Sequence, residues 1–217
     1  MKNASPTVPQ RLKPRKLPLQ ARSGATVEAI HEAVIQVLLA EGLGRLTTTR
    51  VAERAGCSVG TLYQYFPNKE ALLFAILQSH FEDVVAAIKA IDIGAGTRRL
   101  ADLADALADA YVSVKVARPD ATTALYRVAG AIDQFRLSSD VFGRLQSGVV
   151  RVLDSASDVK FREPGQTAFT LLAALAGLSR ASFGALVSDT DILLRLKVES
   201  RLLARSYLAA AARQVEG

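Results

Sequence analysis

Residues 48–66 read TTRVAERAGCSVGTLYQYF, and this stretch decides the fold of the N-terminal part of the chain. The three threonines at 47–49 are N-cap residues for a short helix over residues 50–55. Gly56 ends that helix, and a second short helix is expected over residues 59–65, before Pro67. Two short helices joined by a turn that begins with glycine form a helix-turn-helix.

The segments on either side extend this pattern into a four-helix arrangement. Apolar residues recur at helical spacing from Val27 onward, and Glu41-Gly42 is typical of a helix end. Asn68 can cap a long fourth helix, with Glu70 in its first turn. The helix-turn-helix is therefore expected to lie between a first helix and a long connecting helix.

The rest of the chain is also predicted to be helical. Gly94-Ala95-Gly96 is the clearest break, after which no stretch alternates with period two, so we predict no strands. The sequence indicates an all-α fold of about nine helices, with a three-helix N-terminal head joined by the fourth helix to a C-terminal helical body. The helical patterns after the break cover residues 97–117, 121–136, 139–157, 165–187 and 190–212.

The positive charge of the chain is concentrated at its N-terminus. Residues 1–22 hold six of the 27 basic residues and none of the 21 acidic ones, so the remaining residues are formally neutral. Four prolines in the same stretch exclude a continuous helix. We predict a basic disordered arm over residues 1–22, a DNA-binding domain over 23–68 and a body over 69–217. The arm either adds sequence-independent affinity for phosphates or serves as a solubilising tail.

Composition argues against several other classes of protein. Cys57 is the only cysteine, and the two histidines, His31 and His80, have no companion ligands at metal-binding spacing, so we predict no metal site and no cofactor. The chain shows no glycine-rich phosphate loop, and we predict that it is not an enzyme. The longest apolar run, residues 171–178, is too short to span a membrane, which favours a cytoplasmic protein.

The second short helix carries short hydroxyls, an amide and phenols rather than long charged side chains. Such a face suits a DNA major groove, where it can donate hydrogen bonds to phosphates and base edges. Gly60 and Thr61 permit close approach of the backbone, and Gln64 has the amide needed for bidentate pairing with adenine. Lys69 begins the fourth helix, where free N–H groups favour a phosphate. Cys57 is interpreted as a small packing residue rather than a redox sensor.

Residues 25–75 resemble the tetracycline-repressor family of bacterial regulators. The similarity is carried by Val51-Ala52-x-x-Ala55-Gly56-x-Ser58-x-Gly60-Thr61-Leu62-Tyr63-x-Tyr65-Phe66-x-x-Lys69-Glu70-x-Leu72. It implies a ligand-responsive regulator, usually a repressor, that binds a palindromic operator as a homodimer and is released by a small-molecule effector. The DNA contacts implied for this chain are Thr49, Arg50, Ser58, Gly60, Thr61, Tyr63, Gln64, Tyr65 and Lys69. The alternatives are a helical carrier or enzyme, and an architectural DNA-binding protein that acts through charge.

The last two predicted helices carry the features of a dimer interface. Residues 168–185 are rich in alanine and glycine, which allow another helix to approach closely. The last helix adds one apolar stripe, composed of Leu193, Leu196, Leu203, Tyr207 and Ala210. Two such helices from each of two subunits would form a four-helix interface, although the same helices could also pack only within one subunit.

A ligand pocket is expected within helices four to eight. Its predicted lining is aromatic, with a few polar anchors: Phe81, Tyr111, Tyr126, Phe142 and Phe183, with Arg127, Asp133 or Gln134. Each of these residues could instead serve only the core or the surface. The scarcity of ionisable groups in apolar surroundings favours a neutral or lipophilic effector.

Overall fold

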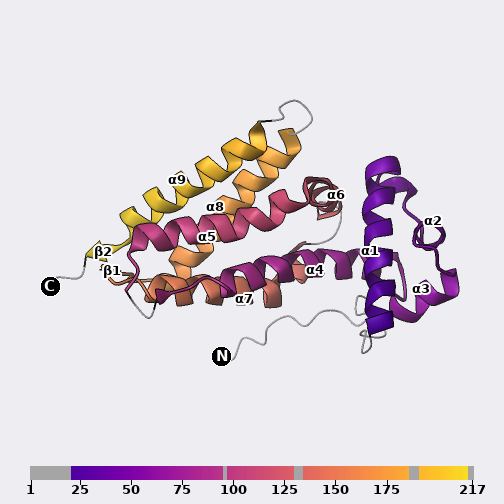
Figure 1. The fold of residues 1–217 in the computed structure, drawn as a ribbon, viewed down its shortest axis with the longest axis horizontal. Coiled ribbons are helices and arrows are strands. Elements are labelled where there is room, and N and C mark those ends of the chain that lie inside the picture. Colours follow the sequence, from indigo (N-terminus) through magenta and orange to yellow (C-terminus); the bar gives the residue numbers. More distant parts are fainter. Residues whose placement is uncertain (1–20, 95–96, 130–133, 186–190, 215–217) are drawn as a thin grey trace. The chain divides into compact units, whose positions relative to one another are not determined.

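The computed structural model describes residues 21–94, 97–129, 134–185 and 191–214. Within these residues the chain forms nine α-helices and one pair of two-residue strands, so the predicted all-α fold is confirmed (Figure 1). The helices are α1 (Ala21–Glu41), α2 (Thr48–Arg54), α3 (Val59–Tyr65), α4 (Lys69–Lys89), α5 (Leu100–Ala117), α6 (Pro119–Ala129), α7 (Gln134–Asp154), α8 (Pro164–Ala185) and α9 (Ile192–Ala211).

Three local features differ from the sequence-based expectation. A short 3-10 helix, η2 (Leu43–Arg45), connects α1 to α2. The strands β1 (Val159–Lys160) and β2 (Arg213–Gln214) pair antiparallel, although none was predicted, because two residues are too few to show an alternating pattern. The predicted arm lies outside the described residues up to residue 20, and α1 already includes Ala21 and Arg22.

The described residues fall into two compact units. The first unit takes residues up to His80 together with 120–139, and the second takes 81–119 and 140 onward. The boundary at residues 68/69 predicted from sequence differs from this division, because the first half of α4 and most of α6 pack into the N-terminal core. The break at Gly94, where φ is 59°, lies in the connection between α4 and α5 inside the second unit.

The core of the first unit is built around α1. Ile30, Val34 and Leu38 lie one turn apart on α1 and are fully buried, so they form a single apolar face. Other helices cover this face with Val51, Ala52, Leu62, Phe66, Leu72, Leu73, Phe74, Ile76, Leu77, Ala121, Ala124, Leu125 and Val128. The helix-turn-helix is thus held by a core to which α1, α4 and α6 also contribute.

The second unit pairs helices through both apolar packing and ion pairs. Arg201 on α9 binds the carboxylate of Asp109 on α5 through two nitrogens at 2.7 and 2.6 Å, and Arg205 pairs with Asp105 one turn away. These bonds hold α9 alongside α5 (Figure 1). They agree with the rotation of α9 about its axis that its buried Leu196, Ala204 and Leu208 define, and each guanidinium engages its carboxylate through two bonds.

α7 packs against the second half of α4. The guanidinium of Arg144 donates to both carboxylate oxygens of Glu82, and the guanidinium of Arg151 donates to the Ile88 carbonyl at 3.1 Å. A Cβ placed on Gly148 would lie 3.1 Å from Ile88 Cγ2, so glycine permits this close approach. Although α4 is long and apolar enough to cross a membrane, half of its apolar window is buried, and it supplies buried side chains to both units.

His31 is buried in the first unit. Among the described residues of this unit, it is the only ionisable side chain whose pKa burial markedly lowers. Its ring lies 5.8 Å from that of Phe66, and its Nε2 is buried with no hydrogen-bond partner in the described part of the chain. Burial lowers the pKa of His31 from 6.5 to about 4. The core therefore accommodates the neutral ring and disfavours the imidazolium.

We predict that His31 makes the fold less stable in mild acid. The unfolded chain binds a proton near pH 6.5 and the folded chain only near pH 4, so stability is lost as pH falls through this window. At about 1.4 kcal/mol per unit of pKa difference, the loss approaches about 3 kcal/mol. Urea unfolding at pH 7 and pH 4.5 should show a smaller pH dependence for His31→Gln and His31→Leu than for the wild type. An unchanged dependence in both variants would contradict the prediction.

Candidate nucleic-acid interface

α2 and α3 each contain seven residues and are joined by a tight turn. Gly56 adopts a φ of 67°, a left-handed conformation that suits glycine, and the Cys57 amide donates to the Ala52 carbonyl at 3.0 Å. Thr47 caps α2, because its side chain accepts a hydrogen bond from the Arg50 amide at 3.3 Å. The Thr47 cap therefore marks the start of α2, and the turn at Gly56 separates α2 from α3.

Ser58 performs the corresponding role for α3. Its Oγ accepts a hydrogen bond from the Thr61 amide at 2.9 Å and lies 2.8 Å from Thr61 Oγ1. Asn68 caps α4 in the same way, since its Oδ1 accepts from the Ala71 amide at 2.7 Å. All three short side chains satisfy amides that a helix N-terminus otherwise leaves without partners.

α3 has a buried face and an exposed face. Leu62 and Phe66, one turn apart, are buried in the first core. Gly60, Tyr63 and Gln64 are exposed at spacings of three and four residues, which places them together on the opposite side of the helix. A Cβ on Gly60 would meet only Ser58 Oγ, at 3.6 Å, so packing does not require glycine there.

The residues predicted to contact DNA differ in whether their side chains already make interactions within the fold. Thr49, Ser58, Gly60, Tyr63 and Gln64 are exposed. Thr48 on α2 and Tyr63 on α3 join the two helices through hydroxyls 3.1 Å apart. This contact links Tyr63, on the exposed face of α3, to α2 through Thr48, a residue that was not among the predicted contacts.

Three predicted contacts also have structural roles that the sequence did not reveal. Arg50 pairs with the carboxylate of Glu41 and donates to the Arg45 carbonyl at 3.1 Å, which ties α2 to the preceding turn. Lys69 Nζ donates to the Leu43 carbonyl at 3.3 Å. The Tyr65 ring is partly buried, 6.3 Å from that of Phe66.

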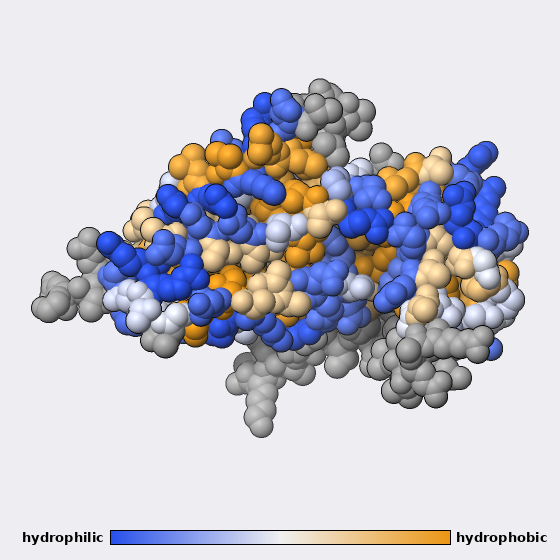
Figure 2. All heavy atoms as spheres, in the orientation of Figure 1, coloured by the Kyte–Doolittle hydropathy of each residue, from blue (hydrophilic) through white to orange (hydrophobic). Residues whose placement is uncertain are grey.

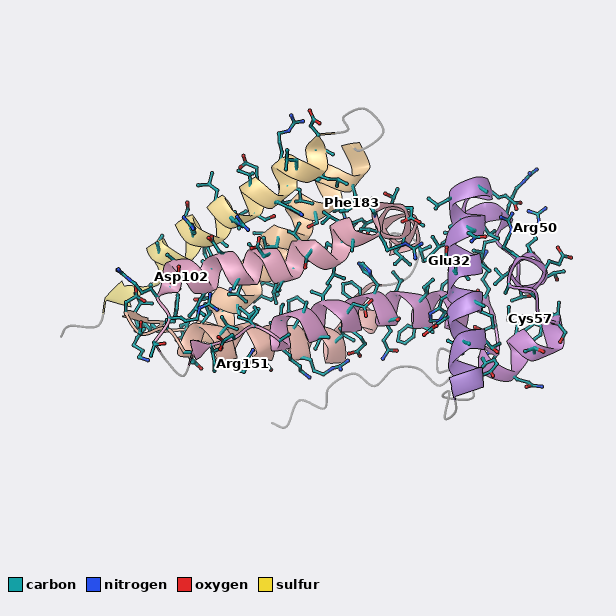
Figure 3. The ribbon with its side chains drawn as sticks, in the orientation of Figure 1. Glu32, Arg50, Cys57, Asp102, Arg151 and Phe183 are labelled. Atoms are coloured by element: carbon teal, nitrogen blue, oxygen red, sulfur yellow. The ribbon has the colours of Figure 1, made fainter. Side chains whose placement is uncertain are left out.

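Cys57 lies in the turn between α2 and α3 (Figure 3). Burial raises the pKa of its thiol, which disfavours the reactive thiolate. The side chain packs against the first core, as expected for a small apolar residue.

The aromatic residues predicted to line a ligand pocket are spread over both units. Phe81 and Tyr111 flank the ammonium group of Lys115, and Phe142 contacts Phe169 edge to face with centroids 5.6 Å apart. Phe183 is buried on α8. Tyr126 belongs to the first unit, and the Arg127 side chain, Asp133 and the Gln134 side chain lie outside the described residues.

Sequence reasoning missed Lys115, the largest polar side chain that is fully buried in the described residues. The signal was available in the helical spacing of α5. Lys115 follows Leu103, Leu107 and Tyr111 at intervals of four residues, so it continues their buried face.

The N-terminal residues match a known protein family. Residues 25–76 match the model described as bacterial regulatory proteins, tetR family. Over 68 residues, the chain is 37% identical to the HTH-type transcriptional repressor KstR of Mycolicibacterium smegmatis, covering 31% of this chain and 33% of that protein. Over 78 residues it is 31% identical to the nucleoid occlusion factor SlmA of Haemophilus ducreyi, covering 34% and 39%. The chain thus aligns with only about a third of each curated relative.

The fold extends the similarity beyond the matched residues. A transcriptional regulator from Rhodococcus sp. Rha1 superposes with a TM-score of 0.67 at 20% identity, covering 85% of this chain and 97% of that one. At this level of identity the similarity shows a shared fold.

We predict opposite effects of alanine at the two glycines of the motif. Gly60→Ala should raise the free energy of unfolding by about 0.5 kcal/mol, because alanine favours the helix and the added Cβ has room. Gly56→Ala should lower it by about 1 kcal/mol, because alanine is strained at φ 67°. Chemical denaturation measures both. A loss of stability in Gly60→Ala would show that packing constrains this position.

Proposed function

The chain belongs, through residues 25–76, to the tetR family of bacterial regulatory proteins, and on this premise we propose that it represses transcription by binding a palindromic operator as a homodimer. The observation that carries the proposal is the exposed face of α3, where Gly60, Tyr63 and Gln64 lie together. An α-helix with a narrow, nearly uncharged face of this kind fits the major groove of B-DNA. A partner of this kind also implies a cytoplasmic protein.

The residues on this face suit two different parts of DNA, the base edges and the phosphates. Gln64 is exposed, and its amide suits an adenine edge, whereas Tyr63 and Thr48 form a hydroxyl pair suited to phosphate oxygens. Gly60 lets the helix backbone come close to the DNA. Arg50 and Lys69 would reach phosphates only by sharing or exchanging the bonds they make within the fold.

The alternative of a helical carrier or enzyme receives less support. The family model describes regulatory proteins, and the described residues contain no group of three or more metal-binding side chains. The architectural alternative is weakened by the formal neutrality of the chain outside residues 1–22.

The proposed dimer interface is formed by α8 and α9. Leu194, Val198 and Leu202 follow one another every four residues on α9 and are 69, 59 and 57% exposed, and Phe169 on α8 is 47% exposed. Hydrophobic side chains gather on the surface over this part of α9 (Figure 2). Small exposed residues of α8, among them Ala173, Ala176, Gly177 and Ala181, would allow the partner helix to come close.

This apolar stripe replaces the one expected from sequence. Within the stripe predicted from sequence, Leu196 is buried and packs inside the subunit, Leu193, Leu203 and Tyr207 are partly buried, and Ala210 is exposed. The difference arises because Leu196, Ala204 and Leu208 form the buried face of α9, which leaves Leu194, Val198 and Leu202 on the outside.

We further propose that a small-molecule effector bound in the second unit releases the DNA. α4 gives the proposal its physical basis, because its first half belongs to the first unit and its second half to the second. An effector would act by favouring a state in which the two reading helices of the dimer are wrongly spaced for the operator.

DNA binding is tested with Gly60→Ala and Gln64→Ala. We expect Gly60→Ala to weaken binding to all operator variants about tenfold although the protein folds, because the added methyl group prevents close approach. Gln64→Ala should instead relax the preference at one base pair, worth about 1–3 kcal/mol. Binding of the wild type and both variants to the upstream DNA and its single-base variants is measured by fluorescence anisotropy.

The matched control for Gln64→Ala is Gln36→Ala, which alters an exposed glutamine on α1. Gln36→Ala should bind every probe as the wild type does. The proposal fails if the wild type prefers none of these sequences over random DNA, or if Gln64→Ala keeps the wild-type preference at every position.

The dimer is tested with Val198→Glu. A carboxylate in the centre of the proposed interface should convert the dimer into a monomer, because a buried, unpaired charge is costly. The control is Leu39→Glu, at an exposed leucine of the first unit, which should remain dimeric. Sedimentation velocity measures both, and a dimeric Val198→Glu protein would place the interface elsewhere.

A further inference from the structure

The second unit contains a pocket that is lined by none of the site residues predicted from sequence. It lies between the start of α5, the end of α9 and the segment leading into β1, which meet at one end of this unit (Figure 1). Its volume is about 280 Å³. A cavity of about 150 Å³ is enough to hold benzene, so this pocket has room for a molecule of two fused rings.

Small apolar side chains form most of the pocket wall. Leu100, Ala104 and Val159 are buried and form its floor. Ala101 on α5 and Ala209 on α9 are exposed, so the pocket opens to solvent between these two helices. Because each alanine contributes a single methyl group, the helices leave a space that longer side chains would fill. Such walls contact the faces of a ring system and offer it no hydrogen bonds.

Arg205 lines the pocket from α9 with a guanidinium that is already held in place. Its Nε donates to Asp105 Oδ1 at 2.6 Å and its Nη2 donates to Oδ2, whereas its Nη1 makes no hydrogen bond among the described residues. The pair with Asp105 fixes the plane of the guanidinium and compensates its charge. Nη1 is therefore available to donate to an acceptor atom of a ligand, and the planar group can also contact an aromatic ring.

Asp158 supplies an acceptor to the same pocket. Its Oδ1 accepts a hydrogen bond from the Leu100 amide at 2.8 Å, and its Oδ2 accepts one from Arg99 Nε at 3.3 Å. The bond from the Leu100 amide, together with Arg99, lowers the pKa of Asp158, so this carboxylate is ionised at pH 7. An ionised carboxylate offers about four acceptor positions, so capacity remains for an N–H donor of a ligand.

The two charges at the pocket are each balanced within the fold. Asp105 compensates Arg205, and Arg99 compensates Asp158. A charged ligand would lose hydration there without gaining an uncompensated opposite charge. A neutral molecule loses less, and it can still use both the free donor and the free acceptor.

We propose that this pocket binds a neutral, planar heteroaromatic molecule of about two fused rings, which accepts a hydrogen bond from Arg205 and donates one to Asp158. The inference goes beyond the proposed repressor function, because it assigns a ligand site outside both the DNA-reading surface and the aromatic lining predicted from sequence. It does not depend on DNA binding.

The test uses probes that share one two-ring frame and differ in charge and hydrogen bonding. They are 2-quinolinone, its N-methyl derivative, quinoline-2-carboxylate and the 1-methylquinolinium cation. Each is titrated into the full-length wild type by isothermal calorimetry. We expect 2-quinolinone to bind with a Kd of about 1 mM or tighter, and about fivefold more tightly than each of the others, because only this probe is neutral and has both an acceptor and an N–H donor.

The contribution of the guanidinium is tested with Arg205→Met and its matched control Arg201→Met. Both arginines are exposed and pair with an aspartate of α5, but only Arg205 lines the pocket. Affinity for 2-quinolinone should fall about fivefold in Arg205→Met and remain that of the wild type in Arg201→Met. If Arg205 only helped to hold α9 on α5, both variants would lose affinity equally.

The location of the site is tested with Ala209→Phe and its matched control Ala210→Phe. These alanines are exposed neighbours on α9, and only Ala209 lines the pocket. The phenyl group at position 209 should fill the pocket and abolish binding of 2-quinolinone, whereas Ala210→Phe should bind it as the wild type does. Ala101→Phe, on the opposite wall, replaces Ala209→Phe if circular dichroism shows that the latter does not fold.

The inference is overturned if the wild type binds none of the probes, prefers a charged probe, or binds the N-methyl derivative as tightly as 2-quinolinone. It is also overturned if the folded pocket variants bind 2-quinolinone as their controls do. Operator binding, measured on the same preparations, reports separately on the proposed function. A protein that binds 2-quinolinone as expected but no specific DNA would contradict the proposed function alone.

Discussion

The arrangement of the reading surface depends on the burial of Leu62 and Phe66. α3 has only seven residues, and a helix of two turns is not stable in water by itself. It persists because these two side chains, one turn apart, enter the core formed with α1 and α4. Their burial also fixes the rotation of α3, since each residue advances the helix by about 100°. The outward position of Gly60 and Gln64 is thus a consequence of which two residues are buried.

The polar residues around this helix serve folding before they serve recognition. Ser58 and Thr61 are bonded to each other, and Lys69 donates to the Leu43 carbonyl in η2, between α1 and α2. A side chain committed in this way is held in place, which lowers the entropy lost on binding DNA but restricts its reach. Gln64 lies on the exposed face and makes no such bond among the described residues. It can therefore vary between related proteins without a cost to the fold, a property expected of a residue that selects sequence.

Local sequence signals located several helix ends in the N-terminal head, although α2, expected over residues 50–55, spans Thr48–Arg54 and η2 was not expected. Gly56, Pro67 and Asn68 mark helix ends by local chemistry, so α3 and the start of α4 were predicted to the residue. In the body, by contrast, the outcome depends on contacts between distant residues. α9 packs on α5, 92 positions away at the pair between Arg201 and Asp109, and the buried Leu196, Ala204 and Leu208 leave a different apolar stripe facing outward. The units likewise divide within α4 rather than at a glycine, because packing decides which half of the helix joins which core.

The stripe on α9 follows from which residues of this helix are buried within the subunit. The carboxylate pairs of Arg201 and Arg205 are exposed, and such pairs contribute little to stability by themselves. Two of them, one turn apart, match the orientation that the buried Leu196, Ala204 and Leu208 give to α9, because a guanidinium binds a carboxylate in a plane. With α9 held in that orientation, Leu194, Val198 and Leu202 remain outside the subunit. Burial of such side chains against a second copy would gain about 25 cal/mol for each Å² removed from water. The buried face of α9 and the matching ion pairs thus fix the orientation, and the apolar side chains left outside would supply the free energy of association.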